Sequence, residues 1–136
     1  MIRILLADDT TIIRKGLRQI LMQEYPSAQI EEIEEDDEWT EKIGGTAWDI
    51  IIFDLLVPDR GGLDTLKRIR QNFPKIRILI LSLHPKENNA MRALKAGASG
   101  YLGKDVAPDE LIRAVQQVLA GKKYLSVPSL QVQAYQ

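Results

Sequence analysis

The chain has 136 residues, of which 45% are hydrophobic and 27% are charged, an ordinary composition for one globular domain. It contains no cysteine, which excludes a disulfide framework, a thiolate zinc site and a cysteine nucleophile. A net charge of -1 argues against a nucleic-acid-binding domain. The apolar start is too short for a signal peptide, and no stretch approaches the ~20 apolar residues of a transmembrane helix. We therefore expect a soluble cytoplasmic protein without a membrane partner.

Apolar runs alternate with segments of helical periodicity. Runs typical of buried parallel strands occupy residues 2–7, 28–33, 49–54, 76–81 and 99–102, of which 28–33 is the weaker candidate. Segments with one apolar helical face occupy residues 11–24, 36–43, 63–73, 87–98 and 108–121. Pro108 suits the first position of the last helix. Residues 55–62, which include Pro58, Gly61 and Gly62, are expected to form a loop.

Five strand–helix units in succession predict an α/β fold, a doubly wound parallel sheet with helices on both faces. Right-handed crossovers leave few possible topologies. Residues 1–121 are predicted to form this domain. Residues 122–136, with Pro128 and a glutamine-rich end, are expected to be a linker or tail.

One short stretch is strongly acidic. It carries seven carboxylates, at Glu31, Glu32, Glu34, Glu35, Asp36, Asp37 and Glu38. Such a run is usually a solvated face or loop, and a docking role for it has no support in the sequence.

Polar side chains stand where the apolar runs end. In an open parallel sheet, ligands bind outside the carboxyl ends of the strands, so these residues are candidates for one shared site. They are Asp8 and Asp9 after the first run, Asp54 after the third, Ser82 after the fourth, and Tyr101 and Lys104 at the end of the fifth. Singly, each has an ordinary interpretation as a cap, a turn residue, a surface lysine or a packing residue; the prediction rests on the whole set meeting at one edge.

These residue types suit magnesium binding and phosphoryl transfer. Neighbouring carboxylates repel one another and stay ionised when a cation lies among them, and an all-oxygen donor set suits Mg²⁺. A carboxylate such as Asp54 can act as the nucleophile that forms an aspartyl phosphate. Lys104 and Ser82 would stabilise the negative phosphoryl oxygens.

These residues resemble the receiver domain of bacterial two-component response regulators over essentially residues 1–121. Each matching piece is weak alone, but their order and spacing are specific. The pieces are Ile4 to Asp9, Ile51 to Leu55, Pro58 and Gly62, Leu79 to Ser82, and Ala96 to Leu102 with Lys104. The resemblance implies a flavodoxin-like (βα)5 sheet of strand order 2-1-3-4-5, with two helices on one face and three on the other.

The resemblance also implies residue roles. Asp54 would accept the phosphoryl group. Asp9, Asp54 and the backbone carbonyl of Leu56 would bind Mg²⁺ directly, and Asp8 would act mostly through a bound water.

Further roles follow from the same resemblance. Ser82 and Lys104 would hold phosphoryl oxygens, and Tyr101 would change rotamer as Ser82 moves inward. A sensor histidine kinase would be the donor. The surface around the fourth helix, fifth strand and fifth helix would then change conformation and control homodimerisation. Such a domain is a switch that catalyses only its own phosphorylation and dephosphorylation, rather than an enzyme.

Within the family, the chain resembles the NarL/FixJ branch. The clues are Ser82-Leu83-His84, the run from Ala96 to Leu102, and Lys104 followed by Asp105. That branch usually carries a LuxR-type helix-turn-helix domain after a linker, so DNA binding would need a C-terminal domain absent from this chain. A truncated form is favoured over a stand-alone receiver.

Some positions depart from the commonest pattern of the branch. Thr10 stands where histidine is frequent, and Asp59 and Arg60 replace small or methionine residues. Leu56 and Leu83 are expected near the phosphoryl group, where they would hinder the attacking water and lengthen the phosphorylated lifetime. His84, the only histidine, is expected to be an ordinary loop residue.

Two other functions fit the pattern less well. A phosphatase of the haloacid dehalogenase type needs two aspartates separated by one residue, whereas Asp8 and Asp9 are adjacent. A flavodoxin-like cofactor binder needs a phosphate-cradling loop after the first strand. The segment from Asp8 to Thr11 is acidic and lacks glycine.

Overall fold

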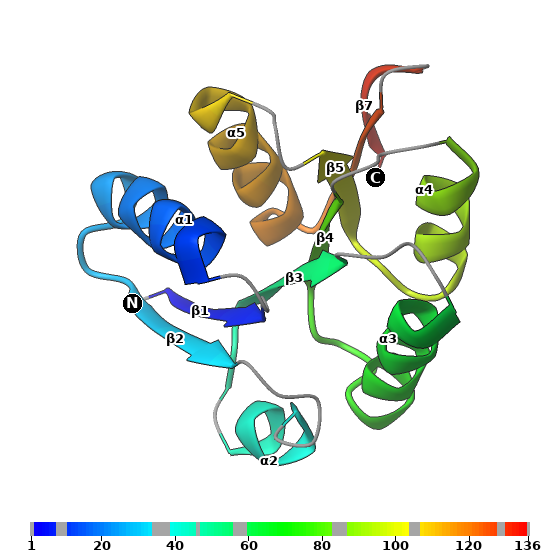
Figure 1. Cartoon of the computed structure of the whole chain (residues 1–136), viewed down its shortest axis with the longest axis horizontal. Helices are drawn as coiled ribbons and strands as arrows, with labels where there is room; N and C mark the ends of the chain where they lie inside the picture. The colour runs from blue at the N-terminus through cyan, green and yellow to red at the C-terminus, as the bar shows by residue number, and fades with distance from the viewer. Residues whose placement is uncertain are drawn as a thin grey trace.

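A single sheet of seven strands forms the centre of the molecule in the computed structural model, which describes residues 2–7, 11–33, 39–45, 47–55, 60–82, 87–103, 107–127 and 130–135. The strands are β1 (Arg3–Ala7), β2 (Gln29–Ile33), β3 (Ile50–Leu55), β4 (Ile78–Ser82), β5 (Gly100–Gly103), β6 (Lys123–Val127) and β7 (Leu130–Tyr135). The helices are α1 (Thr11–Glu24), α2 (Trp39–Gly44), α3 (Arg60–Asn72), α4 (Glu87–Lys95) and α5 (Pro108–Leu119). Their alternation is the predicted α/β pattern (Figure 1).

Helices cover both faces of the sheet, because alternate residues of a strand point to opposite faces. Ile50 and Ile52 of β3 belong to a buried cluster with residues of α1 and α5. Ile51 and Phe53 belong to a second cluster with residues of α2, α3 and α4. The expected division into two and three helices is thus confirmed (Figure 1).

The strand order is β2-β1-β3-β4-β5-β6-β7. The first five strands are parallel and follow the expected order 2-1-3-4-5. β6 then pairs parallel with β5, and β7 pairs antiparallel with β6. The predicted topology is therefore confirmed and extended by two strands.

The structure corrects the prediction that residues 122–136 form a linker or tail. Most of these residues belong to β6 and β7. Tyr124 and Leu125 are each only 1% exposed and enter the two opposite cores. Burial of two large side chains and pairing with β5 make β6 part of the folded domain.

Two helix boundaries bear on the predictions. α3 begins at Arg60, so Gly61 and Gly62 are helical rather than part of the expected loop. α5 begins with Pro108 at the predicted first position, and Asp109 and Glu110 in its first turn face the positive end of the helix dipole. In the described part of the chain, no helix is long and apolar enough to cross a membrane.

Candidate functional site

The carboxyl ends of β1, β3, β4 and β5 meet at one edge of the sheet. Ala7, the last residue of β1, is aligned with Phe53, the residue before Asp54. Asp54 is aligned with Leu81 of β4. Ser82 is aligned with Leu55 on one side and with Gly103, the last residue of β5, on the other. The backbone thus brings the ends of four strands together, as the sequence predicts.

Several predicted site residues lie outside the described residues. They are Asp8, Asp9, Leu56 and Lys104, together with Thr10, Leu83, His84 and Asp59. Asp8 and Asp9 follow the last residue of β1 in the sequence, and Lys104 follows the last residue of β5. Asp54 is described as a residue of β3.

Ser82 is fully buried, with 0% of its surface exposed. Among the residues whose burial is described, it is the one buried polar side chain. Burial of a hydroxyl is unfavourable unless it makes a polar interaction, and Ser82 does have an interaction partner. Ser82 is thus a buried polar side chain at the carboxyl end of an otherwise apolar strand, within the candidate site.

Tyr101 lies on the same face of the sheet as Ser82. It is aligned with Ile80, two residues before Ser82, and side chains two apart share a face. Tyr101 is 1% exposed and belongs to the cluster that contains Ala90 and Ala93 of α4. The small alanine side chains leave room for the buried aromatic ring.

The donor chemistry of this edge fits a magnesium ion. β1 and β3 are adjacent and parallel, and aspartates occupy the positions directly after β1 and near the end of β3. Mg²⁺ is usually bound by one or two carboxylates plus other oxygen atoms. Among the described side chains, no group of three or more His, Asp or Glu could hold a metal ion; the side chains of the predicted ligands fall outside that set.

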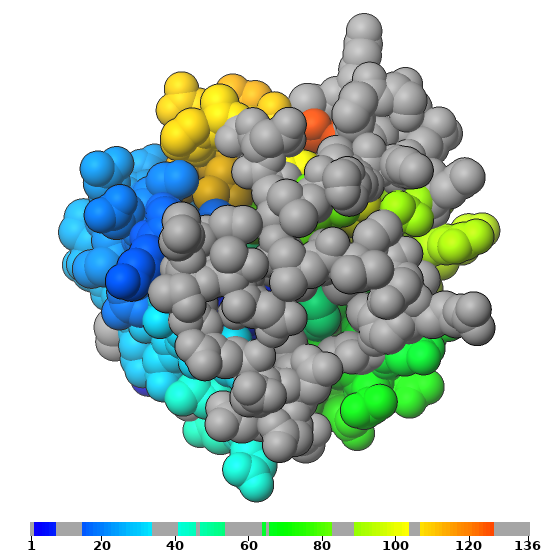
Figure 2. All heavy atoms as spheres, viewed as in Figure 1, coloured from blue at the N-terminus to red at the C-terminus, as the bar shows by residue number. Residues whose placement is uncertain are grey.

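Two described grooves contain none of the predicted site residues. One lies between α1 and α5 and includes Ile20 and Ile112; the blue and yellow surfaces of these helices adjoin in Figure 2. The other includes Trp48 and Phe73. Trp48 is a structural residue, since its indole Nε1 donates to the Lys42 carbonyl at 2.9 Å.

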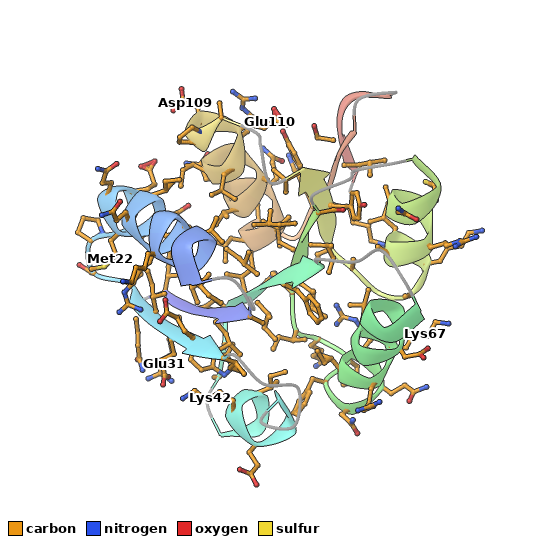
Figure 3. The ribbon with its side chains drawn as sticks, viewed as in Figure 1. Met22, Glu31, Lys42, Lys67, Asp109 and Glu110 are labelled. Carbon is orange, nitrogen blue, oxygen red and sulfur yellow. The ribbon has the colours of Figure 1, made fainter. Side chains whose placement is uncertain are left out.

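Two glutamates in the described part of the acidic stretch form ion pairs with residues of neighbouring helices. The Nζ atom of Lys42 in α2 lies 3.0 Å from Oε1 of Glu31, and the two side chains point toward each other in Figure 3. Arg18 of α1 approaches Glu32 at 3.9 Å. Both carboxylates are partly exposed, which agrees with a solvated face. Residues 34–38 lie outside the described residues.

Two structural contacts at the opposite edge were not predicted. A carboxylate oxygen of Asp49 accepts a hydrogen bond from the Arg3 backbone amide at 2.8 Å, so Asp49 joins β1 to the start of β3. Arg70 donates to the Gly97 carbonyl from Nε and Nη2. Burial lowers the pKa of the Arg70 guanidinium. Sequence periodicity marks Arg70 only as a residue of a helix and holds no signal for this long-range contact.

Known proteins match nearly the whole chain. Residues 4–116 match the family described as "Response regulator receiver domain". The transcriptional activator protein ExaE of Pseudomonas putida is 35% identical over 92% of this chain and 58% of its own length. The nitrate/nitrite response regulator protein NarL of Escherichia coli K12 is 34% identical over 90% of this chain and 57% of its own length. The chain therefore spans less than two thirds of these curated relatives.

Solved structures agree with this assignment. A LuxR-family two-component response regulator from Aurantimonas sp. SI85-9A1 has a TM-score of 0.81 and 36% identity, over 93% of this chain and 90% of that one. The signal receiver domain of the putative response regulator NarL from Mycobacterium tuberculosis has a TM-score of 0.76 and 26% identity, over 88% of this chain and 97% of that one. The chain belongs to the response regulator receiver domain family and, within it, to the NarL/FixJ branch.

Proposed function

We propose that this receiver domain accepts a phosphoryl group on Asp54 from a sensor histidine kinase, in a reaction that depends on Mg²⁺. The observation that carries the proposal is the strand register. It brings Asp54 of β3, buried Ser82 of β4 and the carboxyl ends of β1 and β5 to one edge.

The transfer is a displacement at phosphorus. A carboxylate oxygen of Asp54 forms a bond to the phosphorus atom as the P–N bond of the donor phosphohistidine breaks. The bonding electron pair leaves with the imidazole nitrogen, which then takes up a proton. The product on this chain is an aspartyl phosphate.

The remaining residues act on the charge of the transferred group. Asp8, Asp9, Asp54 and the backbone carbonyl of Leu56 would hold Mg²⁺, Asp8 mostly through water. The bound ion would neutralise charge on the phosphoryl oxygens. The Ser82 hydroxyl donates to one phosphoryl oxygen, and the Lys104 ammonium pairs with another.

Phosphorylation acts as a switch between two packings rather than as turnover of a substrate. Ser82 and Tyr101 share one face of the sheet, so a shift of the Ser82 hydroxyl toward the phosphoryl group changes the space beside the Tyr101 ring. The affected surface comprises α4, β5 and α5. It controls homodimerisation and, in the whole protein, a C-terminal helix-turn-helix domain that binds DNA in the cytoplasm.

The test is phosphorylation with acetyl phosphate and Mg²⁺, followed by intact mass measurement. A stable gain of one phosphoryl group supports the proposal. The gain should disappear with EDTA and in Asp54→Asn, and should persist in Asp64→Asn, because Asp64 is an exposed carboxylate of α3. Steady release of phosphate without a mass gain would instead favour a phosphatase.

A further inference from the structure

The alignment of β6 with β5 is short. Two residue pairs align them, Gly100 with Tyr124 and Tyr101 with Leu125. The backbone amide of Tyr124 donates to the Ser99 carbonyl at 3.1 Å. β4 and β5 are aligned over four pairs. The aligned stretch between β5 and β6 is therefore shorter than that between β4 and β5.

Side chains supply the rest of the docking. Tyr124 enters the cluster that contains residues of α1 and α5. Leu125 enters the opposite cluster, together with Tyr101 and the alanines of α4. The Ser126 hydroxyl donates to Oε1 of Glu110 at 2.7 Å; Glu110 is labelled at the start of α5 in Figure 3. β6 is thus anchored by three consecutive side chains, Tyr124 and Ser126 on the side of α5 and Leu125 on the side of α4.

Gly100 allows the close approach of β6. A Cβ atom at this position would lie 3.2 Å from the Tyr124 carbonyl oxygen and 2.8 Å from the Cδ1 atom of Leu79. A larger residue would displace the Leu79 side chain and press against the Tyr124 carbonyl oxygen. The edge of β5 is therefore shaped to receive this strand.

One face of the sheet connects the candidate site to β6. Ser82 is aligned with Gly103, which has no side chain, so the next side chain of β5 on that face is Tyr101. Leu125 is aligned with Tyr101 in the neighbouring strand and lies in the same buried cluster. Ser82, Tyr101 and Leu125 thus follow one another across β4, β5 and β6.

We propose that β6 is a docked read-out strand, whose attachment to β5 is coupled through Tyr101 and Leu125 to phosphorylation of Asp54. This inference rests on the proposed function and names β6 as the segment whose attachment changes on phosphorylation. When the Ser82 hydroxyl moves toward a phosphoryl oxygen, it vacates volume on its face. The buried Tyr101 ring moves into that volume, toward β4 and away from Leu125 on its other side, so phosphorylation weakens docking of residues 123–127.

Hydrogen exchange of the full 136-residue chain tests the coupling. Exchange of the amides of residues 123–127 is followed with and without acetyl phosphate and Mg²⁺, and phosphorylation is measured by intact mass on the same sample. We expect exchange to become faster by about tenfold, an ordinary size for coupling between two sites. Asp54→Asn should show no change.

The outcomes separate the two proposals. A protein that gains the phosphoryl group but exchanges the amides of residues 123–127 at an equal or slower rate would overturn the coupling and leave the phosphoryl-acceptor function standing. A protein that gains no phosphoryl group would overturn both.

A reciprocal experiment uses variants. Leu125→Ala weakens docking and should shift the population toward the packing that phosphorylation favours, so it should raise the rate of phosphorylation by acetyl phosphate several-fold. Leu125→Met, of similar volume, should leave the rate near that of the parent. Leu17→Ala is the matched control, because Leu17 is a buried leucine of α1 in the opposite cluster. Equal changes of rate in Leu125→Ala and Leu17→Ala would indicate general destabilisation and would count against the coupling.

Discussion

The guanidinium of Arg70 donates two hydrogen bonds to the carbonyl oxygen of Gly97, from Nε at 3.1 Å and from Nη2 at 2.7 Å. Its Nη1 atom also donates to the Pro74 carbonyl at 2.8 Å. Gly97 has a φ of 116°, in the region that favours glycine. Arg70 thus joins the end of α3 to the turn that follows α4.

Replacement of Arg70 by lysine should lower the free energy of unfolding by about 1 to 3 kcal/mol, because an ammonium cannot reproduce the fork of donors on one carbonyl. Urea denaturation measures the change. Arg68→Lys is the matched control, since Arg68 is an exposed residue of the same helix. Equal stabilities of the two variants would contradict the structural role of Arg70.

Stability should fall as pH rises above about 10, the ordinary tyrosine pKa. Burial raises the pKa of Tyr124, the charge of Glu110 raises it further, and Arg113 opposes both. The unfolded chain therefore loses this proton at lower pH than the folded protein does, and folding becomes less favourable as pH increases. Below a pH of about 10, the folded and unfolded states both keep the Tyr124 proton, so Tyr124 adds no pH dependence to stability.

Tyr124→Phe should make stability fall less steeply with pH in that alkaline range, as measured by urea denaturation at a series of pH values. Some slope should remain, because burial and the charge of Glu24 also raise the pKa of Tyr25. An unaltered slope in Tyr124→Phe would show that Tyr124 does not contribute.

Ser82→Ala should slow phosphorylation of Asp54 by roughly tenfold or more, because the variant removes one hydrogen-bond donor to the phosphoryl oxygens. The rate is measured with acetyl phosphate and Mg²⁺. Ser27→Ala, at an exposed position, is the control. An undiminished rate in a folded Ser82→Ala protein would remove Ser82 from the proposed site.

Leu56 and Leu83 are predicted to prolong the phosphorylated state by hindering the attacking water. Loss of the phosphoryl group should then be several-fold faster in Leu56→Asn and in Leu83→Ala. Decay of the phosphorylated mass after removal of acetyl phosphate measures the lifetime. If both variants decay no faster than the parent, the leucines do not control this step.

The pattern of apolar runs was sufficient to predict the first five strands, and the resemblance to receiver domains supplied their order. β3 and β4 are buried on both faces, which is why continuous apolar sequence predicts them well. Ser82 was predicted at the carboxyl edge because a polar residue ends such a run. The roles of Asp8, Asp9 and Lys104 remain predictions, since these residues lie outside the described residues.

Other features depend on long-range contacts that local sequence does not encode. β6 contains Lys123 and Ser126 beside Tyr124 and Leu125, a pattern without clear alternation, and its strand conformation comes from pairing with β5. Gly61 and Gly62 have low helix propensity, yet they lie in the first turn of α3. In both cases tertiary packing outweighs local preference.

The position of β2 at the end of the described strand order has a consequence for solution behaviour. Its free side offers backbone groups to which a strand of another molecule could bind. Glu31 and Glu32 place two carboxylates on this strand, with Lys42 and Arg18 beside them. A second copy approaching edge to edge would have to remove these charged side chains from water, so the charged groups along β2 should keep concentrated protein from aggregating through its sheet.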